Sequence, residues 1–123
     1  MLIILSPAKI QNFKSEQIIT DFTIPDFLDE AEDLVNQVRQ LSVSALAELL
    51  GINTNLAMTN AERFATWHRP FTPDNAKQAV LVFNGEVFHG LDVRSLQKDQ
   101  LAYLQDHLRL FSGLYGLLRP FDL

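Results

Sequence analysis

The sequence predicts a mixed α/β fold, a single domain over residues 1–123 in which four or five helices surround a small sheet. Two short, unbroken apolar runs, residues 2–5 and 79–83, have the form of buried strands. Apolar residues recur every three or four positions from Phe27 to Leu41, as on one face of a helix. A chain of 123 residues that is 47% hydrophobic can bury one core, and no linker rich in Gly, Ser or Pro divides it.

Capping residues place the helices of the first half. A helix over residues 27–41 carries its acidic residues in its first turns, where the helix dipole favours them. A second helix runs from Ser42 to the C-cap glycine Gly51. Thr59 and Glu62 form a capping-box pair for a third helix, although a start near Thr54 stays open.

The second half alternates strand and helix signals. Residues 79–83 are the strongest strand signal, and Asn84-Gly85 after them is a preferred hairpin turn with a return strand over residues 86–88. A helical turn in place of the return strand stays open. A helix from Ser95 then leads to residues 108–112, a candidate third strand.

The charge of the chain weakens, but does not exclude, binding to nucleic acid. The net charge is -5 and the pI is about 5.0, whereas binding to a polyanion needs clustered cations. The acids are concentrated between Asp21 and Asp33, and most Lys and Arg residues lie beyond residue 60. The second half is therefore more balanced in charge than the total indicates.

Composition predicts a cytoplasmic protein without a membrane partner. There is no cysteine, which excludes disulfides and thiolate metal sites. The apolar run at residues 1–5 is too short for a signal peptide, and no apolar run is long enough to cross a bilayer.

The sequence predicts neither a metal site nor a cofactor. Glu86 and His89 have the Glu-x-x-His spacing of di-iron carboxylate sites, but those sites need a second copy on a facing helix. His68 and His107 are isolated in the sequence. We therefore expect His89 to be a turn or surface residue.

The most distinctive stretch is the C-terminal one. Gly113 and Gly116 lie in an apolar context with Arg109 and Arg119 on either side, a pattern that favours a tight turn presenting backbone N–H groups to a phosphate. A structural turn with solvated arginines is the alternative. The residues of the predicted phosphate site are Lys9, Arg109, Ser112, Gly113, Tyr115, Gly116 and Arg119.

The end of the first strand predicts a further anion-binding position. Ser6 and Lys9 follow the apolar run, at the edge where α/β sheets place ligands, so their hydroxyl and ammonium groups can hold an anion. The alternative is that Ser6 satisfies local backbone groups and Lys9 is solvated.

Four segments, taken in order, resemble the YaaA family of bacterial peroxide stress resistance proteins. They are residues 2–9, which contain Ser-Pro-Ala-Lys, residues 60–67, residues 83–91, and residues 107–123, which contain Ser-Gly-Leu-Tyr-Gly. Because family members are longer and have a more basic second half, the chain looks like an N-terminal half. It would then expose surface that the other half covers, and it would self-associate through that surface.

The resemblance implies a role in hydrogen peroxide stress, limiting damage caused by unincorporated iron. It also implies non-specific binding of duplex DNA through a helix-hairpin-helix element, here at residues 112–116. The sequence shows no iron ligands, so we expect any effect on iron to be indirect. These implications favour a noncatalytic protein over an enzyme.

An enzyme acting on a phosphorylated or nucleotide-like small molecule is the alternative. Its pocket would join residues 6–9 to residues 112–115, and Ser6, Lys9 and Arg63 are its candidate lining residues. No P-loop, Gly-x-Gly-x-x-Gly or Gly-x-Ser-x-Gly motif is present.

Overall fold

The computed structural model describes residues 1–123, and the chain divides into two compact units. The first, here called the sheet unit, consists of Met1–Phe27 and Phe71–Leu123, and the second, the helical unit, is Leu28–Pro70. The predicted mixed α/β class is confirmed, with six α-helices and one 3-10 helix in place of the four or five helices expected. A single domain over the whole chain stays a prediction.

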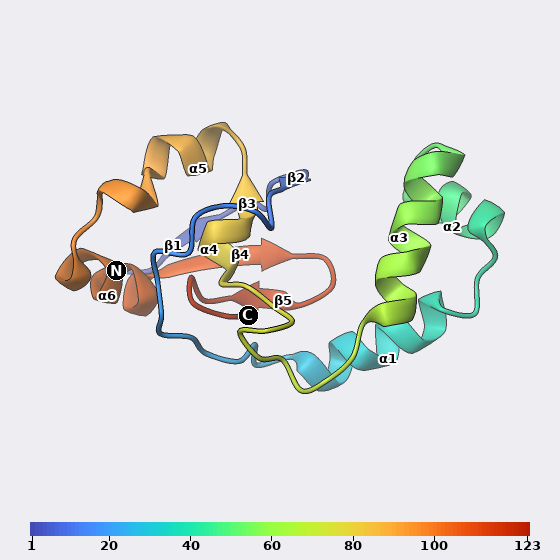
Figure 1. Cartoon of the computed structure of the whole chain (residues 1–123), viewed down its shortest axis with the longest axis horizontal. Coiled ribbons are helices and arrows are strands. Elements are labelled where there is room, and N and C mark those ends of the chain that lie inside the picture. Colours follow the sequence, from blue (N-terminus) through green and yellow to red (C-terminus); the bar gives the residue numbers. More distant parts are fainter. The chain divides into compact units, whose positions relative to one another are not determined.

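The helical unit contains three helices (Figure 1). They are α1 (Leu28–Val38), α2 (Val43–Leu50) and α3 (Thr54–Thr66). Both predicted helices, α1 and α2, form, and Ser42 Oγ accepts a hydrogen bond from the N–H of Ala45 at 3.1 Å. The apolar face predicted from Phe27 to Leu41 is wrong in part, because α1 buries Leu28, Ala31 and Val35 and leaves Phe27, Leu34 and Leu41 exposed. Gly51 ends α2 with a φ of 64°, in the left-handed region.

The start of α3 corrects the capping-box prediction. Asn53 is the N-cap, and its side chain accepts from the N–H of Leu56 at 2.8 Å, so the alternative start near Thr54 is confirmed. Thr59 lies inside the helix, where its hydroxyl donates to the carbonyl of Asn55.

Ion pairs stabilise the charged surface of the helical unit. Arg69 donates hydrogen bonds to Asp29 at 2.7 Å and to Glu32 at 3.2 Å. These two hydrogen bonds, chiefly the one to Asp29, raise the pKa of Arg69 above its ordinary value. Part of the acidic run is therefore neutralised locally.

The sheet unit is built on a three-stranded sheet and a two-stranded one. The strands are β1 (Ile3–Leu5), β2 (Ile10–Gln11), β3 (Phe83–Asn84), β4 (Leu108–Ser112) and β5 (Gly116–Leu118). In the larger sheet, β4 lies between β1, to which it is parallel, and β5, to which it is antiparallel. The strands predicted near residues 2–5 and 108–112 are confirmed, and the smaller sheet pairs β2 with β3. The burial expected for the first strand is wrong, because β1 is an edge strand in which Ile3 and Ile4 are exposed.

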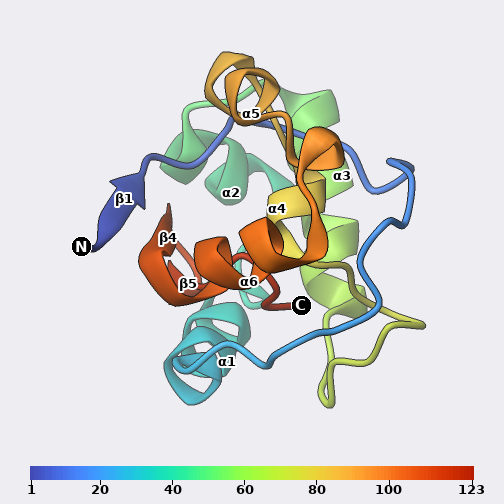
Figure 2. The same cartoon turned by 90° about the vertical axis from the view of Figure 1, so that its left-hand side faces the viewer.

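Helices cover one face of the larger sheet. They are α4 (Ala79–Val82), α5 (Glu86–Leu91) and α6 (Lys98–His107), with a 3-10 helix at Val93–Ser95 between the last two. In Figure 2 all three lie on the same side of β1 and β4, and their residues pack with buried Leu108, Leu110 and Leu118. The helix expected from Ser95 begins at Lys98 instead.

The strand predicted over residues 79–83 is wrong for most of its length. Ala79–Val82 is one buried turn of helix, and only Phe83 belongs to a strand. Its first N–H groups, those of Ala79 and Val80, donate to the carbonyls of Asp122 and Pro120 at 2.8 and 3.1 Å. The N–H groups of Leu81 and Val82 donate to the carbonyl of Gln78. The backbone of this continuous apolar run is therefore hydrogen-bonded as a helical turn and not as a strand.

The hairpin predicted at Asn84-Gly85 is also wrong. Glu86–Leu91 is a helix, so the alternative of a strand followed by a helical turn is confirmed. No helix of the chain is long and apolar enough to cross a membrane.

Candidate functional site

The two motif segments of the sequence leave the larger sheet at the same edge. Because β1 and β4 are parallel, with Leu5 opposite Leu110, the carboxyl ends of both strands point the same way (Figure 1). Beyond those ends, Ala8 and Tyr115 pack against the same core cluster. We call the region formed by residues 6–9 and 112–116 the motif edge, and it is at such strand ends that α/β sheets bind ligands.

The glycine turn presents free backbone donors at the motif edge. Tyr115 N–H donates to Ser112 Oγ at 3.0 Å, whereas the N–H groups of Gly113 and Leu114 have no hydrogen-bond partner in the protein. Gly116 closes the turn with a φ of 72°, and a Cβ there would lie 3.3 Å from the Phe27 ring. The turn can therefore donate to an anion through its backbone.

Strands, not helices, flank this turn. Ser112 pairs with Gly116 and Phe111 with Leu117 in an antiparallel ladder, so the segment is a β-hairpin. The helix-hairpin-helix geometry expected here is therefore wrong for this chain. Parallel pairing with β1 provides the backbone hydrogen bonds that hold β4 extended.

Ser6 and Lys9 bring free polar groups to the motif edge. Both side chains are exposed, and neither makes a hydrogen bond or an ion pair within the protein. A hydroxyl, an ammonium group and two backbone donors are thus available at one edge of the sheet.

The two arginines that flank the turn in sequence lie away from it in space. Since Leu110 is opposite Leu118, the adjoining residues Arg109 and Arg119 are at the open end of the hairpin. Arg109 donates to the carbonyls of Gln105 and Leu108 at 2.9 and 2.7 Å. It therefore binds the end of α6 instead of extending to the turn.

Arg119 is occupied by an internal ion pair. Its guanidinium lies 3.0 Å from Asp122, whose side chain is only 1% exposed, and 3.3 Å from the exposed Asp26. It also donates to the carbonyl of Ile24. The Asp122 carboxylate also accepts hydrogen bonds from Thr23 Oγ1 and from the Arg119 N–H. Arg119 thus holds the C-terminal segment in place.

Arg63 belongs to the helical unit, and its part in a pocket with Ser6 and Lys9 stays a prediction. It lies on α3, where its carbonyl accepts from the N–H of Trp67.

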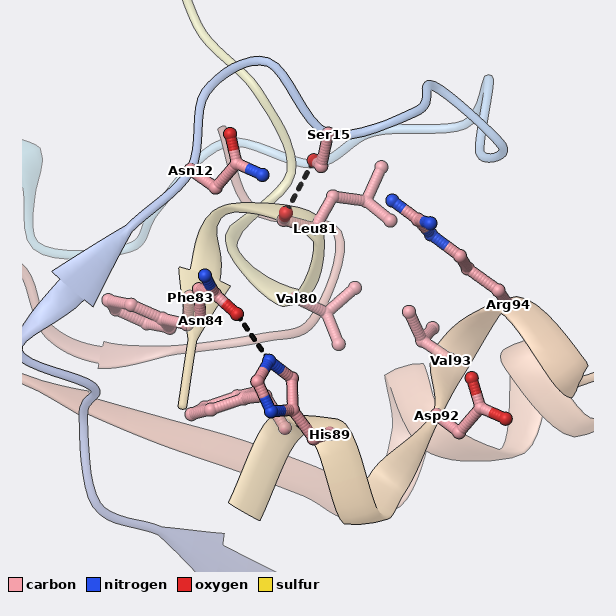
Figure 3. Close-up of a pocket in the computed structure, with 11 residues that line it drawn as sticks. Asn12, Ser15, Val80, Leu81, Phe83, Asn84, His89, Asp92, Val93 and Arg94 are labelled. Carbon is pink, nitrogen blue, oxygen red and sulfur yellow. Dashed lines mark hydrogen bonds between the residues drawn. The ribbon is translucent and has the colours of Figure 1, made fainter. Parts of the chain in front are cut away.

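Sequence reasoning missed a hollow elsewhere in the sheet unit. It has a volume of about 290 Å³ and is lined by residues of three separate stretches, including Asn12, Asn84, His89 and Arg94 (Figure 3). His89 is on α5, not in a turn, and its Nε2 lies 2.6 Å from Asn84 Oδ1. No local motif marks this hollow, because its residues are far apart in the sequence. No group of three or more His, Cys, Asp or Glu residues is placed to hold a metal ion.

Fold and site define a mixed α/β protein that gathers its Ser-Pro-Ala-Lys and Ser-Gly-Leu-Tyr-Gly segments at one edge of a sheet. A family model described as "Peroxide stress protein YaaA" matches residues 1–123, so the chain belongs to this family.

Three similar proteins illustrate the match. Proteins named "UPF0246 protein" are 52% identical in Neisseria gonorrhoeae (strain NCCP11945), 50% in Aromatoleum aromaticum and 49% in Azoarcus sp. (strain BH72), each over 123 residues. The alignments cover 100% of this chain but 48%, 47% and 47% of those proteins. The chain thus spans about half the length of the curated relatives it matches.

Proposed function

We propose that this chain acts in the response to peroxide stress and binds the phosphate groups of duplex DNA, without sequence specificity, at the motif edge. The observation that supports the proposal is the parallel pairing of β1 with β4. This pairing brings free Lys9 and the free N–H groups of Gly113 and Leu114 to one edge of the sheet. Backbone N–H and Lys groups are typical phosphate contacts and carry no sequence information.

The proposal revises the residues expected to bind. Lys9, Ser112, Gly113, Tyr115 and Gly116 remain in it, because they belong to the motif edge. Arg109 and Arg119 leave it, because their guanidinium groups serve internal partners at the other end of the hairpin. Binding would then be weaker, and less dependent on salt, than binding to a turn flanked by two free arginines, because Lys9 is the one cation left in the site.

The wider role follows from the family. We propose a cytoplasmic protein that limits damage from unincorporated iron by an indirect route. The description of the matching family as a peroxide stress protein supports this role. Chelatable iron, measured during peroxide exposure in cells that lack the protein and in cells that regain it, tests it.

A second candidate is an enzyme that acts on a phosphorylated small molecule at the same edge. The meeting of residues 6–9 with residues 112–115 supports it, because a hydroxyl, an ammonium group and backbone donors also suit a single phosphate group. Adenosine monophosphate is a suitable probe for this candidate.

Fluorescence anisotropy of a labelled DNA duplex at several salt concentrations tests the first candidate. Lys9→Gln should weaken binding and lower the salt slope by about one, the value for one phosphate contact. Lys98→Gln is the matched control, since Lys98 is also exposed and unpaired but begins α6, the helix that leads into the first residue of β4, at the other end of that strand from the turn. Absence of binding at low salt would overturn the DNA proposal, and saturable binding of adenosine monophosphate in its place would support the enzyme.

We also propose that the chain self-associates through β1. This strand is at the edge of the sheet, and Leu2, Ile3 and Ile4 are 56%, 38% and 49% exposed. An exposed apolar edge strand is a template for pairing with another chain. Sedimentation at increasing concentration tests this proposal.

A further inference from the structure

The hollow in Figure 3 combines an apolar floor with a polar rim. It lies in the sheet unit, between the segment after β2 and the segment after α5. Its volume of about 290 Å³ suits a small molecule. The floor consists of Val80, Leu81, Phe83, Phe88 and Val93, and the rim consists of Asn12, Ser15, Asn84, His89, Asp92 and Arg94.

Internal hydrogen bonds fix which polar atoms of the rim are left for a ligand. Asn84 Oδ1 can only accept, so its 2.6 Å contact with His89 Nε2 places the proton on that nitrogen. Asn12 Oδ1 accepts from the N–H of Lys14, and Ser15 Oγ donates to the carbonyl of Leu81. The side-chain NH₂ groups of Asn12 and Asn84 therefore remain as free donors.

The charged groups add a further donor. Arg94 makes no ion pair or hydrogen bond through its side chain, and Figure 3 shows its guanidinium pointing toward Leu81. Asp92 has a φ of 44°, and this left-handed residue turns the chain from α5 into the 3-10 helix that carries Arg94. The Asp92 carboxylate also lines the hollow, beside Val93, and it repels an anion bound there.

We propose that this hollow binds a small ring compound that carries an anionic group. The ring packs on Val80, Leu81 and Phe88, and the anion accepts hydrogen bonds from Arg94 and from the amides of Asn12 and Asn84. The proposal goes beyond binding at the motif edge, because none of these residues belongs to that edge.

The test is a titration of the ¹⁵N-labelled chain with benzoate and with orotate, followed by NMR. Benzamide and uracil are the matched probes without charge. We expect the side-chain amides of Asn12 and Asn84 to shift saturably with both acids and more weakly with the neutral compounds.

Three variants separate the proposed contacts from general charge effects. Arg94→Gln should weaken binding of the acids by at least about tenfold, as expected for loss of a charge-assisted hydrogen bond. Asp92→Asn should strengthen it, because the opposing charge is removed. Lys98→Gln, which removes an exposed cation outside the hollow, should leave it unchanged.

Two results would overturn the proposal. One is that neither acid shifts these amides saturably, and the other is that Arg94→Gln, with a native spectrum, binds the acids as the parent chain does. Lys9→Gln should not alter acid binding, so a failure of this site is distinguishable from a failure of the motif edge.

Discussion

Replacing Asp122 by alanine should strongly destabilise the sheet unit. The Asp122 carboxylate is 1% exposed and accepts from Thr23 Oγ1 at 2.6 Å and from the Arg119 N–H at 2.8 Å, besides pairing with the Arg119 guanidinium. Its removal leaves the Thr23 hydroxyl and the Arg119 N–H without their acceptor, while the guanidinium, 28% exposed, keeps Asp26 and the carbonyl of Ile24. Two donors that lose their partner cost about 2–4 kcal/mol. Such a loss is a large part of a stability of roughly 5–15 kcal/mol.

Asp26→Ala is the matched control for this prediction. Asp26 contacts the same guanidinium at 3.3 Å, but its side chain is 67% exposed. An exposed ion pair contributes about 0–1 kcal/mol, so this variant should stay near the parent. Urea unfolding followed by circular dichroism measures both variants. Equal losses of unfolding free energy in the two variants would refute the claim that burial makes the contribution of Asp122 larger than that of Asp26.

Three further outcomes are expected. Gly116→Ala should lower stability by about 1–2 kcal/mol, because Gly116 has a φ of 72° and an added Cβ would lie 3.3 Å from the Phe27 ring. Gly113→Ala, whose added Cβ would have no atom within 4 Å, should have little effect in the same unfolding assay. Ser42→Ala should lose about 1 kcal/mol through its N-cap bond, measured by thermal unfolding. Ile4→Lys should shift sedimentation toward the monomer if β1 is the associating edge, and an unchanged sedimentation profile would count against that edge.

Local signals predicted the elements whose partners are local. The presence of α1 and the caps of α2 were readable because helix periodicity and capping bonds involve residues within a few positions. The buried face of α1 was not, because packing selects Leu28 and Val35 over Phe27 and Leu34. The run at β1 was readable because its flanking Pro7 ends it. These elements need no knowledge of the rest of the chain.

Distant partners decided the elements that were missed. Ala79–Val82 turns into a helix where its N–H groups meet carbonyls of the C-terminal segment, about forty residues later in the sequence. The glycine turn joins strands because β4 pairs with β1 from the other end of the chain. Apolar residues and glycines occur in both helices and strands, so the local sequence does not show which of the two forms.

The candidate site could be predicted only in part, because some of its features depend on local sequence and others on distant partners. The convergence of residues 6–9 and 112–116 follows from placing both at strand ends, and it was predicted as the pocket of the alternative, the enzyme. The loss of Arg109 and Arg119 from the turn depends on the hairpin register and on the buried Asp122, neither of which spacing reveals. The hollow at Asn12 and Arg94 joins segments that no motif connects.

The central claim is that phosphate groups bind at the motif edge, and an NMR titration of the ¹⁵N-labelled chain with a short DNA duplex at low salt tests it most directly. The account predicts that the backbone amides of Gly113 and Leu114 and those around Lys9 shift together and saturably, and that the shifts decrease as salt is raised. Shifts confined to the open end of the hairpin, at Arg109 and Arg119, or no shifts at all, would contradict it.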